Sequence, residues 1–414
     1  MPESPIVSII IPVCNVWDKT LACLRSLGQY TKGHSIEIIV VDNHSTDATS
    51  TELTPLGASL FGQVFRTLRM AENLGFAKAC NAGAAAASAP LLYFLNNDTV
   101  VTPNWLGPQL VALDAPEVGA VGPLLLYPDN TVQHCGIYVT PFGEVGHLYE
   151  QLPASFAAAR RPHTLQAITA AAMLLRARDF WDCGGFHEGY VNGFEDVDLC
   201  LSLGRKGLGM RVEPRSIVWH HASQTPGRFL QASANSALLT QRQGQWLIPD
   251  MHALAASDGY ELHIGPTLST WLALPDRRQA ELTAAAKARP ALLEDVCRRL
   301  LEREPLWRQG WLLLTQSLLQ RAGPAEALKT FFAQWWLFPD EATLRTLQDL
   351  HIQVYGFPDV QLGDMLRKEQ EADLTTNAQM VRQARKKASA RHDLSLLRLC
   401  DTWLERYAPA EAGV

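Results

Sequence analysis

The sequence predicts a Rossmann-like, mostly parallel α/β domain followed by an all-α, repeat-like domain. Three observations support this prediction. Short β-branched and aromatic runs alternate with helical patterns as far as Leu95. Such runs disappear after about residue 240, where the pattern becomes helical. The length of 414 residues also exceeds the size at which one hydrophobic core keeps growing, which favours two domains.

The elements of the first half follow from the spacing of its apolar residues. Buried strands are predicted at four apolar runs: 6–12, 36–41, 64–68 and 91–95. Helices are predicted between them, around Leu21, Leu24 and Leu27, after Asp47, and over the Ala-rich segment 75–87. Strands that alternate with helices favour a parallel sheet with short connections.

Composition excludes several classes of protein. With 47% hydrophobic and 19% charged residues, the chain is an ordinary globular protein. Its net charge of −6 gives no general attraction to nucleic acid or to an anionic bilayer. The eight cysteines form no C-x-x-C pair, which favours reduced thiols over a disulfide framework or a zinc site.

Targeting signals are also absent from the sequence pattern. The first residues, MPESPIVSIIIP, lack the basic start, long apolar core and cleavage site of a signal peptide. The apolar run 79–95 is interrupted by Asn81, Gly83, Ser88 and Pro90, so we expect no transmembrane segment. We therefore expect a cytoplasmic protein, with peripheral association at the inner membrane as an open alternative.

Polar residues follow three of the predicted strands. They are Asn15, the pair Asp42 and Asn43, and the run Asn96, Asn97 and Asp98. In parallel α/β sheets, ligands bind beyond the carboxyl ends of the strands, so these residues predict a binding site at one edge. The alternative is that each of them only forms a turn or caps a helix.

Five segments of the sequence resemble, in order, the blocks of family 2 glycosyltransferases of the GT-A fold. They are VSIIIPVCN (7–15), EIIVVDNHSTD (37–47), RMAENLGFAKACNAG (69–83), LLYFLNNDT (91–99) and GGFHEGYVNGFEDVDLCLSLGRKG (184–207). The resemblance is closest to bacterial rhamnosyltransferase-like members and spans roughly residues 5–235. It implies inverting, metal-dependent transfer of a sugar from a nucleoside diphosphate sugar to an acceptor hydroxyl, in surface glycan or glycoconjugate synthesis.

The resemblance also implies a metal site for Mn²⁺ or Mg²⁺. Asn96, Asn97 and Asp98 stand where the family has its D-x-D motif, so Asp98 is expected to bind the metal. Asn96 replaces the first Asp, and with Asn97 it is expected to bind the ribose or a phosphate. A His completes the metal site in the family, and His220 matches that position better than His221.

The nucleoside and the diphosphate are expected to lie at the first blocks. By the same resemblance, Asp42 binds the base or the ribose of a UDP- or dTDP-sugar, and Pro12 and Asn15 line the pocket. Asn73 and Gly75 precede a predicted helix whose N-terminus would favour a diphosphate. The alternative for these two residues is a helix cap with a flexible entry.

The densest group of carboxylates predicts the catalytic base. Glu195, Asp196 and Asp198 lie within four positions, and crowding raises the pKa of one such group toward that of a general base. The family has its base in this ED motif, so Asp196 is expected to be the base and Glu195 to position the acceptor. The reverse assignment stays open, and Asp198 has an alternative role at a helix N-terminus.

The second half resembles tetratricopeptide (TPR) repeats in one segment. Pro305 and Pro339 lie 34 residues apart, with Trp311, Leu314, Ala327 and Phe331 between them at the spacing of that repeat. The alternative is an unspecialised helical bundle. We expect a catalytic domain over 1–240, a linker over 241–266, a TPR-like domain over 267–405 and a flexible tail over 406–414.

Several questions stay open from the sequence. The acceptor can be a glycan, a lipid-linked molecule or a protein, and the helical domain can recruit it, bind a protein partner or mediate self-association. A different class of function is an inactive GT-A scaffold whose helical domain binds a partner. The presence of Asp98, Glu195, Asp196 and His220 argues against that class, because a scaffold has no chemical need for all four.

Overall fold

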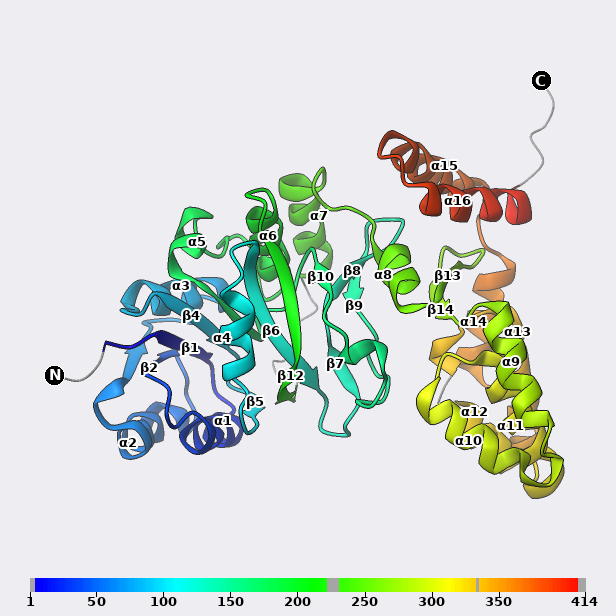
Figure 1. The fold of residues 1–414 in the computed structure, drawn as a ribbon, viewed down its shortest axis with the longest axis horizontal. Coiled ribbons are helices and arrows are strands. Elements are labelled where there is room, and N and C mark those ends of the chain that lie inside the picture. Colours follow the sequence, from blue (N-terminus) through cyan, green and yellow to red (C-terminus); the bar gives the residue numbers. More distant parts are fainter. Residues whose placement is uncertain (1–3, 222–230, 333–334, 409–414) are drawn as a thin grey trace. The chain divides into compact units, whose positions relative to one another are not determined.

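The computed structural model describes residues 4–221, 231–332 and 335–408. The chain divides into two compact units. One contains residues 1–138 and 145–248, and the other contains residues 139–144 and 249–414. Each unit has its own secondary structure (Figure 1).

A curled, mixed sheet forms the centre of the first unit. Its strands lie in the order β10-β12-β6-β11-β4-β1-β2-β3, with β5 paired to β12 and β7 paired to β6. Their bounds are β1 Val7–Val13, β2 Ile36–Asp42, β3 Phe65–Arg69, β4 Leu91–Leu95, β5 Thr99–Val101, β6 Val118–Leu126, β7 Val132–His134, β10 Thr164–Leu165, β11 Ala172–Arg176 and β12 Gly209–His220.

The four predicted strands and the three helices between them are confirmed. β4, β1, β2 and β3 pair in parallel, and the connecting helices are α1 Trp17–Tyr30, α2 Thr49–Phe61 and α3 Phe76–Ala86. Ile9 and Ile11 of β1 share a buried cluster with Leu24 of α1, whereas Ile10 contacts α3 at Gly83. Alternate side chains of β1 therefore face helices on opposite sides of the sheet, which explains its continuous apolar run.

The other half of the sheet departs from the parallel pattern. β11 is antiparallel to both β4 and β6, while β12 is parallel to β6 and antiparallel to β5. Parallel pairing therefore joins β4, β1, β2 and β3 and also β6 to β12, and the sheet as a whole is mixed. The pairing of β12 with β5 sets His220 opposite Thr99, directly after the Asn96–Asp98 run. The sheet thus joins two segments that are more than a hundred residues apart in the sequence.

Shorter elements complete the first unit. They are α4 Gly107–Leu113, β8 Ile137–Val139, β9 Val145–His147, α5 Ala177–Asp182, α6 Glu195–Gly204 and α7 Ala232–Gln243. The start of β8 and the whole of β9 lie in this unit. Every cysteine of the chain is a free thiol, and six of the eight are buried, as expected for reduced thiols.

The second unit is mainly helical. Its helices are α8 Met251–Asp258, α9 Asp276–Lys287, α10 Leu293–Arg303, α11 Arg308–Ala322, α12 Pro324–Phe332, α13 Glu341–Tyr355, α14 Val360–Gln370, α15 Leu374–Ala390 and α16 Leu394–Tyr407. From α10 to α14, each helix packs on the next. Ala327 and Phe331 are buried in this stack. No helix in the described part of the chain combines the length and the apolar character needed to cross a bilayer.

One strand pair in this unit contradicts the expectation that strands end near residue 240. β13 Glu261–Ile264 and β14 Thr270–Ala273 form an antiparallel hairpin. Each strand has only four residues, so the run is too short for hydrophobic periodicity to detect it.

Candidate active site

Asp98 and His220 lie side by side at the edge of the sheet. Oδ1 of Asp98 is 3.0 Å from Nε2 of His220, and both side chains are almost completely buried. The backbone N–H of His221 also donates to the carbonyl oxygen of Asp98, which holds the end of β12 against the turn after β4. The two predicted metal ligands are therefore brought together.

A glutamine fixes the orientation of the His220 ring. Nε2 of Gln133, on β7, donates to the carbonyl oxygen of His220, so Oε1 of Gln133 faces Nδ1 of the ring at 2.5 Å. Nδ1 must then carry a proton, because a carbonyl oxygen can only accept. Consequently Nε2 is the ring nitrogen on the side of Asp98 Oδ1 and of the Asn96 amide, whose Nδ2 lies 3.3 Å away.

This pair has the chemistry of a site for a divalent cation. A carboxylate oxygen and an imidazole lone pair at this separation fit a metal such as Mn²⁺ or Mg²⁺. No cluster of three His, Cys, Asp or Glu side chains suitable for a metal occurs among the described residues. Asp98 and His220 are the two side chains that would hold such a metal.

The neighbouring predicted residues have different partners. The Asn97 amide donates to Oγ1 of Thr20 on α1. Nδ1 of His221 lies 3.1 Å from the ammonium group of Lys19, and burial and this cation lower the pKa of His221. The ring of His220 is set against the carboxylate of Asp98, and the charge of the same carboxylate also acts on His221.

The predicted nucleoside residues lie at the carboxyl ends of β1 and β2. Asp42 is buried, accepts a hydrogen bond from the backbone N–H of Ser45 and forms an ion pair with Arg69. Oδ1 of Asn15 accepts from the backbone N–H of Thr46. Pro12 is the next-to-last residue of β1 and is set opposite Val41 of β2. The turn after β2 is thus held by Asn15 and Asp42 together.

Asn73 and Gly75 lie at the entry to α3. Gly75 has φ of +84°, a conformation that favours glycine, and its N–H donates to Oδ1 of Asn73. The side chain of Asn43 donates to the same oxygen. The first N–H of α3, that of Phe76, donates to Oδ1 of Asn192, which lies in the loop before α6. The α3 N-terminus is therefore joined to the segment that carries the ED motif.

The ED motif forms the first turn of α6. Oδ1 of Asp196 accepts from the N–H of Val197, and Oδ2 accepts from the N–H of Ala170. Glu195 is buried, and its Oε2 accepts from the N–H of Gly193 at 2.7 Å. Both carboxylates are thus oriented by backbone groups.

The Asp198 carboxylate is held by neighbouring side chains. Its carboxylate accepts hydrogen bonds from Tyr190, Arg242 and Gln243. Burial by itself raises the pKa of Asp198, but these three partners outweigh it and hold the pKa below its ordinary value. Asp198 therefore links α6 to α7. This environment agrees with a structural role for its carboxylate and not with a catalytic role.

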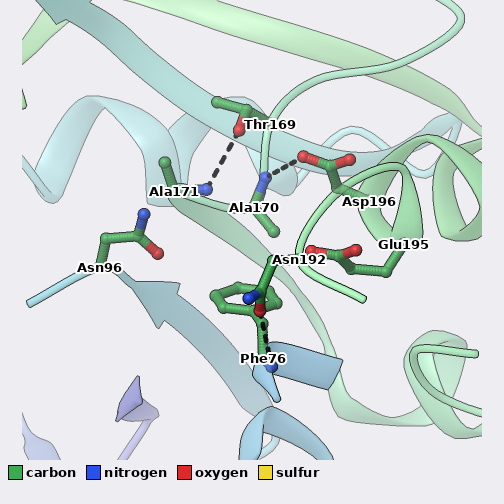
Figure 2. Close-up of a pocket in the computed structure, with 8 residues that line it drawn as sticks. All are labelled: Phe76, Asn96, Thr169, Ala170, Ala171, Asn192, Glu195 and Asp196. Atoms are coloured by element: carbon green, nitrogen blue, oxygen red, sulfur yellow. Dashed lines mark hydrogen bonds between the residues drawn. The ribbon is translucent and has the colours of Figure 1, made fainter. Parts of the chain in front are cut away.

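One cavity connects the strand end to the ED motif. Figure 2 shows Asn96 on one side of this cavity, with Glu195 and Asp196 across from it. The cavity has a volume of about 100 Å³, and its other lining residues are Phe76, Thr169, Ala170, Ala171 and Asn192. A second cavity of about 300 Å³ borders the same two carboxylates and extends to β9 and α7.

Residues of three further segments belong to this site, and the sequence did not predict them. Gln133 and His134 lie on β7, Thr169 and Ala170 lie in the loop before β11, and Asn192 lies in the loop before α6. Asn192 stands inside a segment that resembles the family, but its type gives no sign of a contact with α3. Burial and the ring of His147 lower the pKa of His134 well below its ordinary value, so His134 is neutral.

Residues 8–182 match the family model described as Glycosyl transferase family 2. The O-antigen biosynthesis protein RfbC of Myxococcus xanthus is 34% identical over 226 residues, which are 53% of this chain and 18% of that protein. The N-acetylglucosaminyl-diphospho-decaprenol L-rhamnosyltransferase of Mycobacterium tuberculosis is 28% identical over 276 residues, or 58% of this chain and 86% of that enzyme. The match to the first six curated relatives spans from 18% to 54% of their length.

A structural comparison finds the crystal structure of GalNAc-T7 with UDP, GalNAc and Mn²⁺. The TM-score is 0.46, the sequences are 17% identical, and the match covers 53% of this chain and 44% of that one.

Proposed function

Because residues 8–182 match the family model described as Glycosyl transferase family 2, we propose that the chain is an enzyme of that family with the GT-A fold, and that it transfers a sugar from a nucleoside diphosphate sugar to an acceptor hydroxyl with inversion. The position of the Asn96 side chain is the main support for this proposal. Its amide contacts Nε2 of His220 beside Asp98, and its side chain lines the same cavity as Asp196. A donor bound at the strand end would therefore present its sugar toward the carboxylates of the ED motif.

Asp98 and His220 would hold Mn²⁺ or Mg²⁺. When bound, the metal supplies positive charge that offsets the charge of the departing diphosphate. Asn96 and Asn97 supply amide groups for the phosphates or the ribose, while Pro12, Asn15 and Asp42 line the nucleoside pocket. Asn73 and Gly75 set the entry to α3, whose N-terminal amides favour an anion.

Asp196 is the proposed base. As the acceptor oxygen attacks the anomeric carbon, its proton passes to the Asp196 carboxylate. The bond between the anomeric carbon and the diphosphate oxygen breaks, and its electron pair leaves with the diphosphate. One displacement at that carbon inverts its configuration, as a single attack by water does in an inverting glycosidase. Glu195 supports the acceptor beside the base.

The helical region is proposed to serve the acceptor. Residues 267–405 would form a TPR-like domain that recruits a glycan, lipid-linked or protein acceptor or mediates self-association, while residues 1–240 carry the chemistry. Exposed Tyr355 and Phe357, at the turn between α13 and α14, are apolar groups that such a partner would cover.

A thermal-shift panel tests the proposed function. UDP, dTDP and GDP and their sugars are added with Mn²⁺ or with EDTA to the wild type, to Asp98→Asn and to Asp364→Asn, which changes an exposed carboxylate of the helical unit. A ligand at 100 times its Kd stabilises the folded state by about 2.7 kcal/mol, or about 5–10 °C for a unit of this size. We expect this shift with one nucleotide and Mn²⁺ in the wild type and in Asp364→Asn.

Two outcomes would count against the proposal. If no nucleotide shifts the melting temperature with Mn²⁺, the donor site is refuted. If the shift is equal with EDTA and in Asp98→Asn, nucleotide binding stands but the metal assignment is wrong.

A further inference from the structure

A third cavity of the first unit lies at the C-terminal ends of α6 and α7. Its volume is about 410 Å³, larger than that of either cavity beside the ED motif, and it shares no described lining residue with them. Helices α6 and α7 contact each other in this unit (Figure 1), and the last residue of α5, Asp182, also lines the cavity. The proposed transfer reaction does not use this cavity.

The lining of this cavity is rich in positive charge, although the chain has a net charge of −6. It contains three cationic side chains, Arg205, Lys206 and Arg242, and Asp182 is the one carboxylate among its described lining residues. The ammonium group of Lys206 donates to the carbonyl oxygen of Asp182 and lies 3.7 Å from its carboxylate, so this exposed ion pair is weak. Such a lining favours an anionic ligand.

Both arginines are held by partners that do not line the cavity. Nε of Arg242 donates to the buried carboxylate of Asp198, which fixes its position and balances its charge. The guanidinium of Arg205 lies over the ring of Trp246, 5.7 Å from its centroid, and no carboxylate in the described ranges forms an ion pair with it. Arg205 therefore carries an unbalanced charge, and its planar group is already oriented for a phosphate.

The end of α6 does not by itself account for these cations. Cations near the C-terminus of a helix are favoured by its dipole and can cap its last carbonyl groups. Here the backbone provides the cap, since the carbonyl oxygen of Leu203 accepts from the N–H of Lys206. The side chain of Arg205 instead lies on Trp246, and that of Lys206 reaches α5.

A hydroxyl group adds a neutral donor to the cavity. Nε2 of Gln243 donates to Oδ1 of Asp198 and to Oγ of Ser202. Because Oγ of Ser202 accepts this bond, its own O–H remains to donate. No acceptor for that O–H occurs in the part of the chain that the structure describes. A phosphate oxygen is the kind of acceptor that would complete this group.

We infer that this cavity, named here the phosphate cavity, binds a phosphate group, carried by a small phosphate compound or by a phospholipid headgroup. Arg205 and Lys206 supply the positive charge, and Ser202 donates a hydrogen bond to a phosphate oxygen. The phosphate cavity is separate from the proposed donor site, so the inference does not depend on the proposed function.

Isothermal titration and vesicle sedimentation test this inference and distinguish the two sources of phosphate. Inorganic phosphate and pyrophosphate are the small probes, used in EDTA at low ionic strength because salt screens exposed charges. Vesicles of phosphatidylglycerol are the lipid probe, beside vesicles of phosphatidylcholine. Binding of a small probe indicates a small phosphate compound. Binding of phosphatidylglycerol vesicles alone, in preference to phosphatidylcholine, indicates a headgroup.

Variants locate the bound probe. Arg205→Met combined with Lys206→Met removes two cations, and we expect the Kd for the bound probe to rise at least tenfold. The matched control is Arg367→Met with Lys368→Met, an adjacent and exposed Arg–Lys pair on α14, which should bind as wild type.

Two further variants complete the set. Ser202→Ala keeps the cations but removes the hydroxyl, and it should raise the Kd about tenfold. Asp98→Asn should bind the small probes as wild type, because the donor site is elsewhere. Urea denaturation of each variant checks that it is folded, and Ser202→Ala decides the question if the double variant is not.

Three results would overturn the inference. The first is no binding of a small probe together with no preference for phosphatidylglycerol. The second is an unchanged Kd in the folded double variant or, if that variant does not fold, in Ser202→Ala. The third is an equal loss in the α14 control pair. None of these results bears on the proposed function, which the shift with nucleotide and Mn²⁺ tests separately.

Discussion

Gln133→Met tests whether the orientation of His220 matters for metal binding. Gln133 is 5% exposed, and its amide makes two hydrogen bonds to His220, one to the ring and one to the backbone carbonyl. Methionine fills a similar volume, but its thioether sulfur is only a weak acceptor for Nδ1–H. The ring of His220 is then free to rotate, which turns Nε2 away from Asp98.

The size of the effect follows from the position of Gln133. It does not touch the metal site itself but orients a ligand of that site, and loss of such a partner costs about 10–100-fold in metal affinity. This corresponds to about 1.4–2.8 kcal/mol of binding free energy. The apparent Kd for Mn²⁺ in the presence of saturating UDP or dTDP should rise by that factor, with the affinity for nucleotide in EDTA unchanged.

Gln109→Met is the matched control. Gln109 is also completely buried, and its amide bonds Tyr93, Trp105 and Ser216. Both substitutions leave buried polar groups without partners and should lower the free energy of unfolding by about 1–3 kcal/mol. Isothermal titration with Mn²⁺ and urea denaturation separate the two effects. An unchanged Mn²⁺ affinity in Gln133→Met, or an equal loss in Gln109→Met, would refute the role of Gln133.

Three further predictions concern the base and the fold. Asp196→Asn should lower the rate of transfer by about 10²–10⁴-fold with nucleotide binding intact, and a larger loss in Glu195→Gln, measured in the same assay, would reverse the two roles. Asp198→Asn should cost about 2–3 kcal/mol at neutral pH, because Arg242 loses its partner. Since the folded-state pKa of Asp198 lies below the ordinary value of 3.8, this stabilisation is complete above pH 3.8 and is lost as the pH falls through the folded pKa, so acid titrations of wild type and variant should converge there. Gly83→Ala should cost about 1–3 kcal/mol in urea denaturation, because its Cβ would lie 2.5 Å from Ile10 Cγ2. Gly28→Ala, whose Cβ would meet nothing closer than 3.6 Å, should be neutral or stabilising, and equal costs at the two glycines would contradict the packing argument.

The sequence predicts β1, β2 and β4 because these strands are buried on both sides of the sheet. β1 and β2 therefore appear in the sequence as short apolar runs. An amphipathic helix of the same length would instead show apolar residues on one face only. The resemblance predicts that Asp98 and His220 share one metal site, and the structure sets their side chains 3.0 Å apart. Their function as metal ligands stays a prediction.

Other parts of the site depend on long-range pairing that leaves no local signal. Gln133 contacts His220 only because β7 and β12 both pair with β6. Asp196 meets the N–H of Ala170, a backbone group that any residue type would offer. Residue type and spacing therefore identify the groups that do chemistry better than the groups that orient them.

The contacts between α3 and the loop before α6 also determine how this domain can be recombined with a relative. Asn81 of α3 accepts from the N–H of Phe186 and donates to its carbonyl oxygen, and Phe76 donates to Asn192. Exchange of residues 76–86 alone removes the Asn81 side chain wherever the relative differs there, and exchange of residues 185–196 alone removes that of Asn192. A chimera should therefore move the two segments together, although more than ninety residues separate them in the sequence.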